Sequence, residues 1–236
     1  MGGFVFKMPE QDNTGEYFWL DENALIKNTT DACFYDEYEI IEKIRENKEG
    51  YFDFSKNMID IGACYGAYTS LLDFKYNYAF EPNKEMCCLL YANIQLKNKV
   101  YNTDVYNVAL DNHFGHTKFD GFACEGSDSP DYNDNYSYTV DVKPLDSYNT
   151  TNVGFIKIDV EGFEERVLRG GIGTIIRNNY PPILFECWPV DGGYYKTSKE
   201  KRDSLYNFIK SLGYEIIEGW GQYNTHLAIN SKFYLR

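Results

Sequence analysis

The segment DIGACYGAYTS contains the residues that best suit a cofactor site in this chain. Its Gly62 and Gly66 have a G-x-x-x-G spacing, which differs from the glycine patterns of dinucleotide sites and of phosphate loops. Asp60 lies two residues before the first glycine, where a carboxylate suits an ammonium group better than a pyrophosphate. Glu81 follows Asp60 by 21 residues, near the position of the acid that binds ribose hydroxyls in nucleoside-binding sheets. A ribose without a phosphate, together with an amine, describes S-adenosylmethionine, whereas a glycine loop alone would equally suit an ordinary strand-to-helix turn.

A second segment, FIKIDVEG, carries charges where a buried strand would be apolar. Alternation along an extended strand predicts one apolar face and one charged face, the charged face consisting of Lys157, Asp159 and Glu161. Charges near the end of a central parallel strand are costly unless they pair or act chemically. We therefore interpret all three as active-site candidates. The alternative is a buried Lys157–Asp159 ion pair with Glu161 in solvent.

The next apolar segment, PPILFECW, ends its hydrophobic run at Glu186, which should project toward the same cleft unless it only caps a loop. If a hydroxyl is methylated, its proton needs an acceptor, and the candidates are Asp159, Glu161, Glu186 and His226. Lys157 would keep Asp159 ionised or orient the acceptor oxygen. Alternatively, two or three carboxylates bind Mg²⁺. The six cysteines and three histidines lack metal-ligand spacing, so any metal would be oxygen-liganded, and we expect none. Tyr65 and Tyr68, beside the two glycines, could line the cofactor pocket or the acceptor pocket.

The positions of these residues follow from an alternation of strands and helices. Apolar runs predict strands at 57–62, 76–82, within 100–110, at 139–146, 153–162 and 181–188, and two closing strands in YEIIEGW and HLAINSKFYL. Helical spacing occurs at 35–47, 66–74, after a cap at Asn83, and at 163–171 and 198–213. This order predicts an α/β fold with an open, mostly parallel sheet, an antiparallel edge and helices on both faces.

Composition limits the remaining possibilities. The 236 residues carry a formal net charge of −13, which disfavours binding to nucleic acid, and 43% are hydrophobic, which excludes general disorder. Neither a secretory signal nor a membrane-spanning run is visible, so we expect a cytoplasmic protein. We assign residues 1–34 to an N-terminal extension or lid and 35–236 to one domain. Residues 111–138 should form a substrate loop or an edge hairpin.

Several segments together resemble one family, the FkbM-type S-adenosylmethionine-dependent methyltransferases. These segments are DIGACYGAYTSLL, AFEPN, YNVALDNHFG, VKPLDSY, GFIKIDVEGFEERVLRGG and PPILFE, in an order that spans about residues 35–186. The resemblance implies a class I methyltransferase (Rossmann-like) fold and O-methylation of a hydroxyl, often on a sugar. Within the matching segments it implies further cofactor contacts at Ala63, Tyr65, Pro82, Asn107, Val108 and Asp159.

From the sequence we therefore predict an O-methyltransferase that acts on a sugar or glycan acceptor. The alternatives are a methyltransferase of a small non-sugar metabolite, or a non-catalytic cofactor-binding module of the same fold. The acid residues Asp60, Glu81, Asp159 and Glu161 argue against the non-catalytic alternative.

Overall fold

A computed structural model describes residues 6–7, 17–18, 32–121, 123–221 and 224–234. Its centre is a seven-stranded sheet in the order β11-β12-β10-β9-β3-β4-β5. The strands are β3 (Asn57–Ile61), β4 (Tyr76–Phe80), β5 (Thr103–Tyr106), β9 (Val153–Ile158), β10 (Ile183–Glu186), β11 (Glu215–Ile217) and β12 (Thr225–Ile229). Strands β3, β4, β5, β9 and β10 run parallel, and β12 pairs antiparallel with β10 and β11. The predicted mostly parallel sheet with an antiparallel edge is confirmed.

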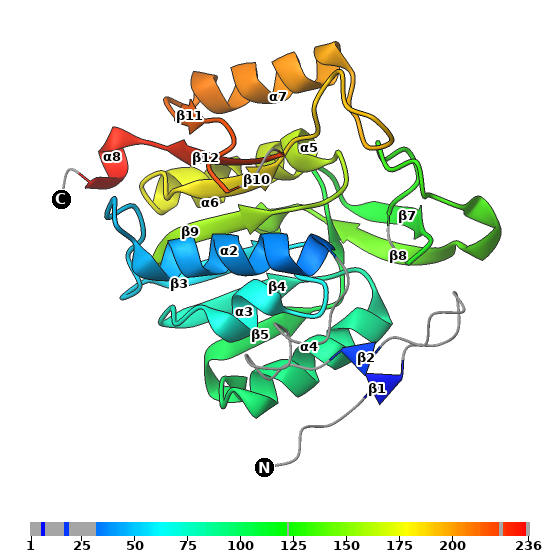
Figure 1. The fold of residues 1–236 in the computed structure, drawn as a ribbon, viewed down its shortest axis with the longest axis horizontal. Helices are drawn as coiled ribbons and strands as arrows, with labels where there is room; N and C mark the ends of the chain where they lie inside the picture. The colour runs from blue at the N-terminus through cyan, green and yellow to red at the C-terminus, as the bar shows by residue number, and fades with distance from the viewer. Residues whose placement is uncertain (1–5, 8–16, 19–31, 122, 222–223, 235–236) are drawn as a thin grey trace.

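Helices cover both faces of this sheet (Figure 1). One face packs against α2 (Ala32–Glu46) and α3 (Ala67–Leu71) through a cluster that includes Ile41, Ile44, Met58 and Phe155, and α4 (Lys84–Leu96) adds Leu90 against Ala79. The other face packs against α5 (Glu164–Arg169), α6 (Ile172–Arg177) and α7 (Lys199–Ser211). Ile59 and Ile156 face this second cluster, so neighbouring residues of each central strand are buried on opposite faces.

A smaller sheet in the order β6-β8-β7 lies beside the carboxyl ends of the parallel strands (Figure 1). Its strands are β6 (Ala109–Leu110), β7 (Gly115–Phe119) and β8 (Tyr138–Lys143), and β7 pairs antiparallel with β8. Strand β7 thus pairs with β8, which we predicted as a separate strand, whereas within residues 111–138 Phe119 forms an isolated antiparallel bridge with Cys124. The predicted edge hairpin is therefore replaced by pairing in this separate sheet. Short 3-10 helices at Val100–Asn102, Asp134–Tyr136 and Leu145–Ser147 connect the elements.

The structure corrects the sequence prediction at four elements. Strand β9 ends at Ile158 rather than continuing to Gly162, because Glu161 and Gly162 adopt left-handed backbone conformations that end the strand. After the Gly170–Gly171 pair the chain forms a second helix, α6, which we did not predict from the residue pattern. The segment after Asn230 is a short helix, α8 (Ser231–Tyr234), and not the end of a strand. Helix α2 begins at Ala32, before the predicted start.

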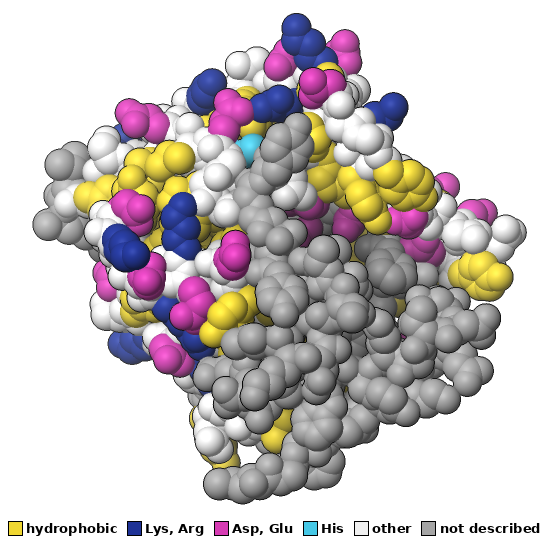
Figure 2. All heavy atoms as spheres, viewed as in Figure 1, with side chains coloured by type: hydrophobic (Ala, Val, Ile, Leu, Met, Phe, Trp, Pro, Cys, Tyr) yellow, Lys and Arg dark blue, Asp and Glu magenta, His cyan; other side chains and the backbone are white. Residues whose placement is uncertain are grey.

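The expected extension or lid falls almost wholly outside the described residues. Within it, β1 (Phe6–Lys7) pairs antiparallel with β2 (Tyr17–Phe18). The described part of the chain contains no helix long and apolar enough to cross a membrane. In the view of Figure 2, Lys and Arg side chains are interspersed with Asp and Glu.

Candidate functional site

The central strands β3 and β9 are neighbours in the sheet, and the order of strands reverses between them. In open α/β sheets this switch point, beyond the carboxyl ends of the strands, is where ligands bind. The register places Asp60 of β3 directly beside Lys157 of β9. The two segments with candidate residues, far apart in sequence, therefore meet at one place.

Lys157 connects the two strands and the glycine loop. Its Nζ donates to the Gly62 carbonyl at 2.8 Å and lies 3.6 Å from Asp159 Oδ2 and 3.9 Å from Asp60 Oδ1. Burial alone would lower the pKa of this amine, but the Asp159 and Asp60 carboxylates raise it above its ordinary value. Lys157 is therefore a cation that partly offsets the acids around it. The ion pair that we kept as an alternative exists, although Lys157 shares it between two carboxylates.

Asp60 is fully buried behind the glycine loop. Its Oδ2 accepts a hydrogen bond from Thr69 Oγ1 at 2.6 Å, and its Oδ1 has no hydrogen-bond partner within the described residues. The carboxylate thus contacts α3 and Lys157, while its second oxygen retains unused capacity to accept a hydrogen bond.

Packing explains the two glycines of the loop. Gly62 has φ of 70°, and a Cβ added there would lie 1.8 Å from the Asp159 carbonyl oxygen. Gly66 has φ of 85°, and its added Cβ would lie 2.3 Å from Leu90 Cδ1. The close neighbours in the structure are the chain's own backbone and side chain, so the loop is held tightly against Asp159 and α4.

Glu81 lies at the end of β4 and is 6% exposed. Its Oε2 accepts from the Cys64 amide at 2.8 Å, and its Oε1 accepts from the Asn83 amide at 2.7 Å. Burial raises the pKa of Glu81 to about 7, although these two amides oppose the shift. The carboxylate is therefore fixed between the glycine loop and the start of α4, where Asn83 caps the helix as predicted.

The remaining predicted cofactor contacts surround Glu81. Asn107 donates its amide hydrogens to the carbonyls of Glu81 at 3.0 Å and Pro82 at 2.8 Å. Ala63 and Val108 are buried in apolar clusters, and their amides donate to the carbonyls of Phe80 and Tyr106, each at 3.1 Å.

Tyr65 lies within the glycine loop and Tyr68 follows it. Tyr68 is buried with Lys157 Nζ 5.3 Å from its ring centroid. Tyr65 donates its hydroxyl to Glu37 Oε2 of α2 at 2.7 Å, and burial raises the pKa of Glu37. We did not predict a role for Glu37. The available signal was its helical spacing with Ile41 and Ile44, which places an acid on the buried face of α2.

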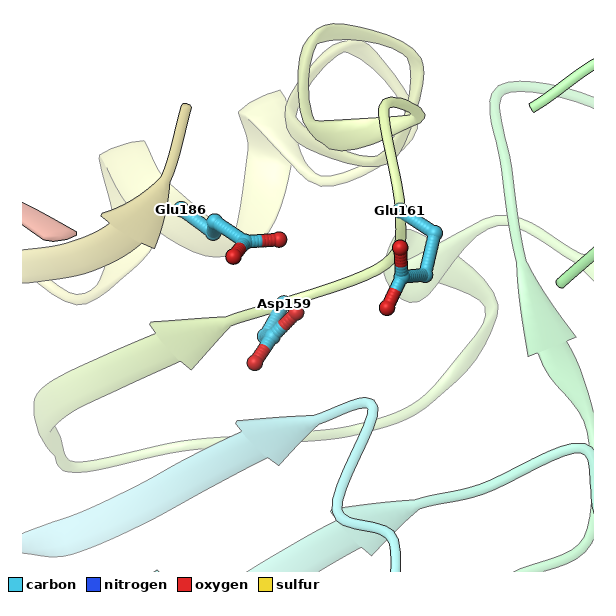
Figure 3. Close-up of side chains that lie close together, drawn as sticks. All are labelled: Asp159, Glu161 and Glu186. Carbon is cyan, nitrogen blue, oxygen red and sulfur yellow. The ribbon is translucent and has the colours of Figure 1, made fainter. Parts of the chain in front are cut away.

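Three carboxylates gather beyond the ends of β9 and β10 (Figure 3). Asp159, Glu161 and Glu186 each offer an oxygen, and these oxygens lie within 4.8 Å of one another. Asp159 and Glu161 follow β9, and Glu186 is the last residue of β10. We call these three residues the acid cluster. The sequence pattern predicted all three for one cleft, and the structure brings them together, although a turn rather than strand alternation positions Glu161.

The acid cluster holds protons more strongly than ordinary carboxylates do. Burial, followed by the nearby charges of Asp159 and Glu164, raises the pKa of Glu161 to about 8. Burial and the charges of Asp159 and Glu161 raise the pKa of Glu186 well above its usual range. A carboxylate with a pKa near 8 is a stronger base than an exposed one, so the part of the cluster that is ionised near neutral pH can accept a hydroxyl proton.

Two further residues, which we did not predict as part of the site, hold the acid cluster in place. Glu164 Oε1 accepts from the amides of Val160 at 3.1 Å and Gly162 at 3.3 Å, which fixes the turn that carries Glu161. Asn224 donates to Glu186 Oε1 at 2.6 Å. The E-G-F-E spacing is a weak local signal for Glu164, whereas nothing in the sequence links Asn224 to Glu186.

His226 does not join the acid cluster as a proton acceptor. It is buried, its Nδ1 accepts from the Gly219 amide at 2.8 Å, and its Nε2 lies 3.2 Å from the Cys187 carbonyl. With Nδ1 accepting, Nε2 carries the proton and donates it to that carbonyl. Burial also lowers the pKa of His226, so the ring is neutral and both nitrogens are engaged. Our suggestion of His226 as the base is wrong on this geometry.

Comparison with known proteins shows the family and the fold. The family model described as Methyltransferase FkbM domain matches residues 60–216, more than half of the chain. The crystal structure of methyltransferase FkbM from Methylobacillus flagellatus KT aligns with a TM-score of 0.56 and 19% identity over 87% of this chain. This chain covers 57% of that one. At this identity the similarity shows the fold alone, that of class I methyltransferases.

A second solved structure is similar over much of its length. It is a precorrin-6y C5,15-methyltransferase from Geobacter metallireducens GS-15, with a TM-score of 0.45 and 15% identity over 86% of this chain and 90% of that one. No curated protein matches the chain.

Proposed function

The chain belongs to the FkbM methyltransferase family, and on that premise we propose that it transfers a methyl group from S-adenosylmethionine to a hydroxyl of a sugar or glycan. The observation that carries the proposal is the position of the acid cluster. Its oxygens lie within 4.8 Å of one another, and Asp159 is in direct backbone contact with the glycine loop. A cofactor held at the loop and a hydroxyl at the cluster would therefore be adjacent.

The residues beyond β3 and β4 fit the cofactor. Each Glu81 oxygen accepts one amide and retains a lone pair for a ribose hydroxyl. The fully buried Asp60 Oδ1, without a hydrogen-bond partner among the described residues, can accept from an ammonium group or from a water molecule that bridges to it. Glu81 and Asp60 would hold the cofactor, with the backbone of residues 62–66 and 107–108. When bound, S-adenosylmethionine supplies a methyl group on a sulfonium, which is already activated for displacement by oxygen.

The chain's own contribution is positioning and proton transfer. The acceptor hydroxyl must lose its proton as the new carbon–oxygen bond forms, and the acid cluster receives it. Asp159, paired with Lys157, keeps a negative charge beside Glu161 and helps raise the pKa of that neighbour. Because the carboxyls interact, the proton belongs to the cluster rather than to one residue. Glu164 and Asn224 are positioning residues for Glu161 and Glu186.

Two alternatives to this proposal are an enzyme that acts on a non-sugar acceptor and a module that binds the cofactor without turnover. A small non-sugar hydroxyl compound would need the same cofactor residues and the same base. A non-catalytic module would need the cofactor residues but not a cluster with raised pKa values, so the pKa of about 8 at Glu161 favours an enzyme.

Mass spectrometry tests the proposal directly. The full chain is incubated with S-adenosylmethionine and with parallel sets of sugar and non-sugar hydroxyl acceptors. A gain of one methyl group on a sugar, with an equal amount of S-adenosylhomocysteine, is the expected result. Methylation confined to the non-sugar set, or calorimetric binding of S-adenosylmethionine without any product, would contradict it.

A further inference from the structure

A cavity of about 450 Å³ opens beside the acid cluster, between α5, the residues that follow β10 and the start of α7. Glu186 belongs to both, since it lines the cavity and is one of the three cluster residues. A molecule in this cavity would thus reach the proposed proton acceptor from the side of α7, whereas the glycine loop lies beyond Asp159. Figure 1 shows α5 and α7 on this side of the sheet.

The three basic residues that line the cavity are all paired with acids. Arg166 forms a bidentate pair with Asp111, at 2.7 Å from Nη2 and 2.9 Å from Nε. Arg202 Nη2 lies 2.6 Å from Glu218 Oε2, and Lys201 pairs with Asp128. An anionic ligand would have to compete with a carboxylate for each cation.

The amino end of α7 is likewise supplied with negative charge. A helix amino end attracts anions, and α7 starts at this cavity. Here the Asp128 carboxylate accepts from Thr197 Oγ1 at 2.6 Å and pairs with Lys201, while Ser198 Oγ accepts from the Lys201 amide. Glu200 adds a further acid in the first turn. Asp128 therefore takes the place that a phosphate or carboxylate of a ligand would occupy.

Acids without a basic partner remain on the cavity wall. Among the described residues, no ion pair reaches Glu164, Glu186 or Glu200. Burial raises the pKa of Glu164 to about 7, so at neutral pH this carboxyl is present both with its hydrogen and as a carboxylate. Burial also raises the pKa of Glu186 well above its usual range. Hydroxyl groups both donate and accept, and so match such a wall.

One aromatic surface completes the cavity. Trp188 lines it, with its ring centroid 5.1 Å from that of Tyr195, and Leu205 of α7 contributes an apolar patch. A pyranose has an apolar face of C–H groups and a rim of hydroxyls, so an aromatic wall opposite carboxyls suits both parts of it.

We propose that this cavity is the acceptor pocket and that it selects uncharged polyhydroxylated acceptors against those carrying a phosphate, sulfate or carboxylate near the reacting hydroxyl. This inference rests on the proposed function for the identity of the reacting group. The cavity's preference between neutral and anionic ligands can nevertheless be measured without turnover. The net charge of −13 acts in the same direction at long range.

Fluorine NMR of the full chain with 5-fluorotryptophan tests this preference. The chain has three tryptophans, and the Trp188→Phe variant identifies the cavity resonance. The titrants are methyl glucoside, galactoside and mannoside, the corresponding methyl glycosiduronates, and inorganic phosphate. We expect at least one glycoside to shift the Trp188 resonance. The corresponding uronate should need an about tenfold higher concentration for the same shift, and inorganic phosphate should leave the resonance unchanged. A uronate or phosphate that acts at equal or lower concentration, or glycosides that shift nothing, would overturn the inference.

A charge-reversal variant and a matched control test whether the cavity sets this preference. Glu200→Lys should bring the concentration that the uronate needs to within about threefold of that of its glycoside, since it replaces an acid of the cavity wall with a cation. Glu39→Lys makes the same change of charge on an exposed position of α2, outside the cavity, and should leave the preference as it was. Equal effects of the two variants would contradict a preference set by the cavity. Because this readout needs no cofactor, its failure is distinct from a failure of methyl transfer.

Discussion

Asp159 takes part in three contacts of the site at once. Its carbonyl lies against Gly62, its carboxylate lies 3.6 Å from Lys157 Nζ, and its side chain belongs to the acid cluster. A residue that was purely structural would need only the first two. The third contact places Asp159 within reach of the proposed reacting hydroxyl, and its replacement separates the two roles.

Asp159→Asn keeps the size of the side chain and removes its negative charge. We expect turnover to fall by about 10²-fold or more, while the affinity for S-adenosylmethionine changes much less. The reason is that the cluster loses the charge that keeps Glu161 basic. Turnover, calorimetric affinity and melting temperature are measured on the same variant. A less stable protein with near-normal turnover would show that Asp159 serves only the ion pair with Lys157.

Glu81→Ala tests the ribose assignment. We expect the affinity for S-adenosylmethionine to weaken by about 1–3 kcal/mol, because the ribose hydroxyls lose a charge-assisted acceptor. Calorimetry on a folded variant measures it, and circular dichroism checks the fold, since the Cys64 and Asn83 amides also lose their acceptor. Unchanged affinity in a folded variant would contradict the assignment.

Metal removal tests whether the acid cluster acts through protons or through an ion. The pKa of Glu161 is raised to about 8 and that of Glu186 is raised well above its usual range, so a metal would have to compete with protons, while Lys157 already supplies a cation. We expect treatment with EDTA followed by dialysis to leave turnover unchanged. Loss of turnover that Mg²⁺ or Mn²⁺ restores would show that the cluster binds a hard cation.

At the scale of elements, the site depends on how closely the β3 and β9 ends approach. The Asp159 amide donates to the Ile61 carbonyl at 3.0 Å, and Lys157 donates to the Gly62 carbonyl. The turn after β9 then positions Glu161 through its left-handed backbone, with φ of 58°. Such conformations cost free energy for a residue other than glycine, and Glu164 offsets part of that cost by accepting two amides of the turn.

Gly62→Ala should disrupt this approach. An added Cβ would meet the Asp159 carbonyl and would also strain a backbone with positive φ, so we expect a loss of about 2–5 kcal/mol in the free energy of unfolding. Gly50→Ala is the control, because Gly50 has a similar φ of 71° with no atom within 4 Å of the added Cβ. It should cost roughly 1–2 kcal/mol. Urea denaturation measures both, and equal losses would show that the contact with Asp159 contributes nothing.

At the scale of the whole molecule, four buried glutamates of the site would place unfavourable negative charge in one region if all were ionised. Burial raises the pKa values of Glu81, Glu161, Glu164 and Glu186 in the folded chain. The full chain adds a net charge of −13 at neutral pH. Proton uptake by these buried groups therefore stabilises the folded state.

The resulting pH dependence has a definite sign. A carboxyl whose pKa is higher in the folded state stabilises the fold fully below the unfolded value and loses that effect as pH rises through the folded value, here about 7 to 8. His226 acts oppositely below its ordinary pKa but is a single group. We expect unfolding free energy to fall by on the order of 2–4 kcal/mol between pH 5 and about pH 9.

Urea denaturation across this pH range measures the slope. Glu161→Gln should flatten it, whereas Glu49→Gln, at an exposed position, should leave it unchanged. Stability that rises steadily with pH would show that these carboxyls are ionised in the folded chain.

Local patterns of residues were enough to predict the order and type of most elements and the segments that form the site. Apolar runs and helical spacing are local properties, so they predicted the central strands, the principal helices and the Asn83 cap. The charges of Lys157, Asp159 and Glu161 stood out because a buried strand rarely carries them. The prediction failed where a local backbone conformation decided the outcome, as at the turn that ends β9, at α6 and at α8.

Only the tertiary structure decided which of these residues act on one another. The contacts of Gly62 with Asp159, of Glu81 with the Cys64 amide and of Glu186 with Asn224 join residues that are 97, 17 and 38 positions apart. The raised pKa values arise from burial and from charges brought together across strands, and the cavity beside α7 becomes acidic because distant partners neutralise its cations. Such effects depend on sheet register and loop packing, which the pattern of residue types along the chain does not encode.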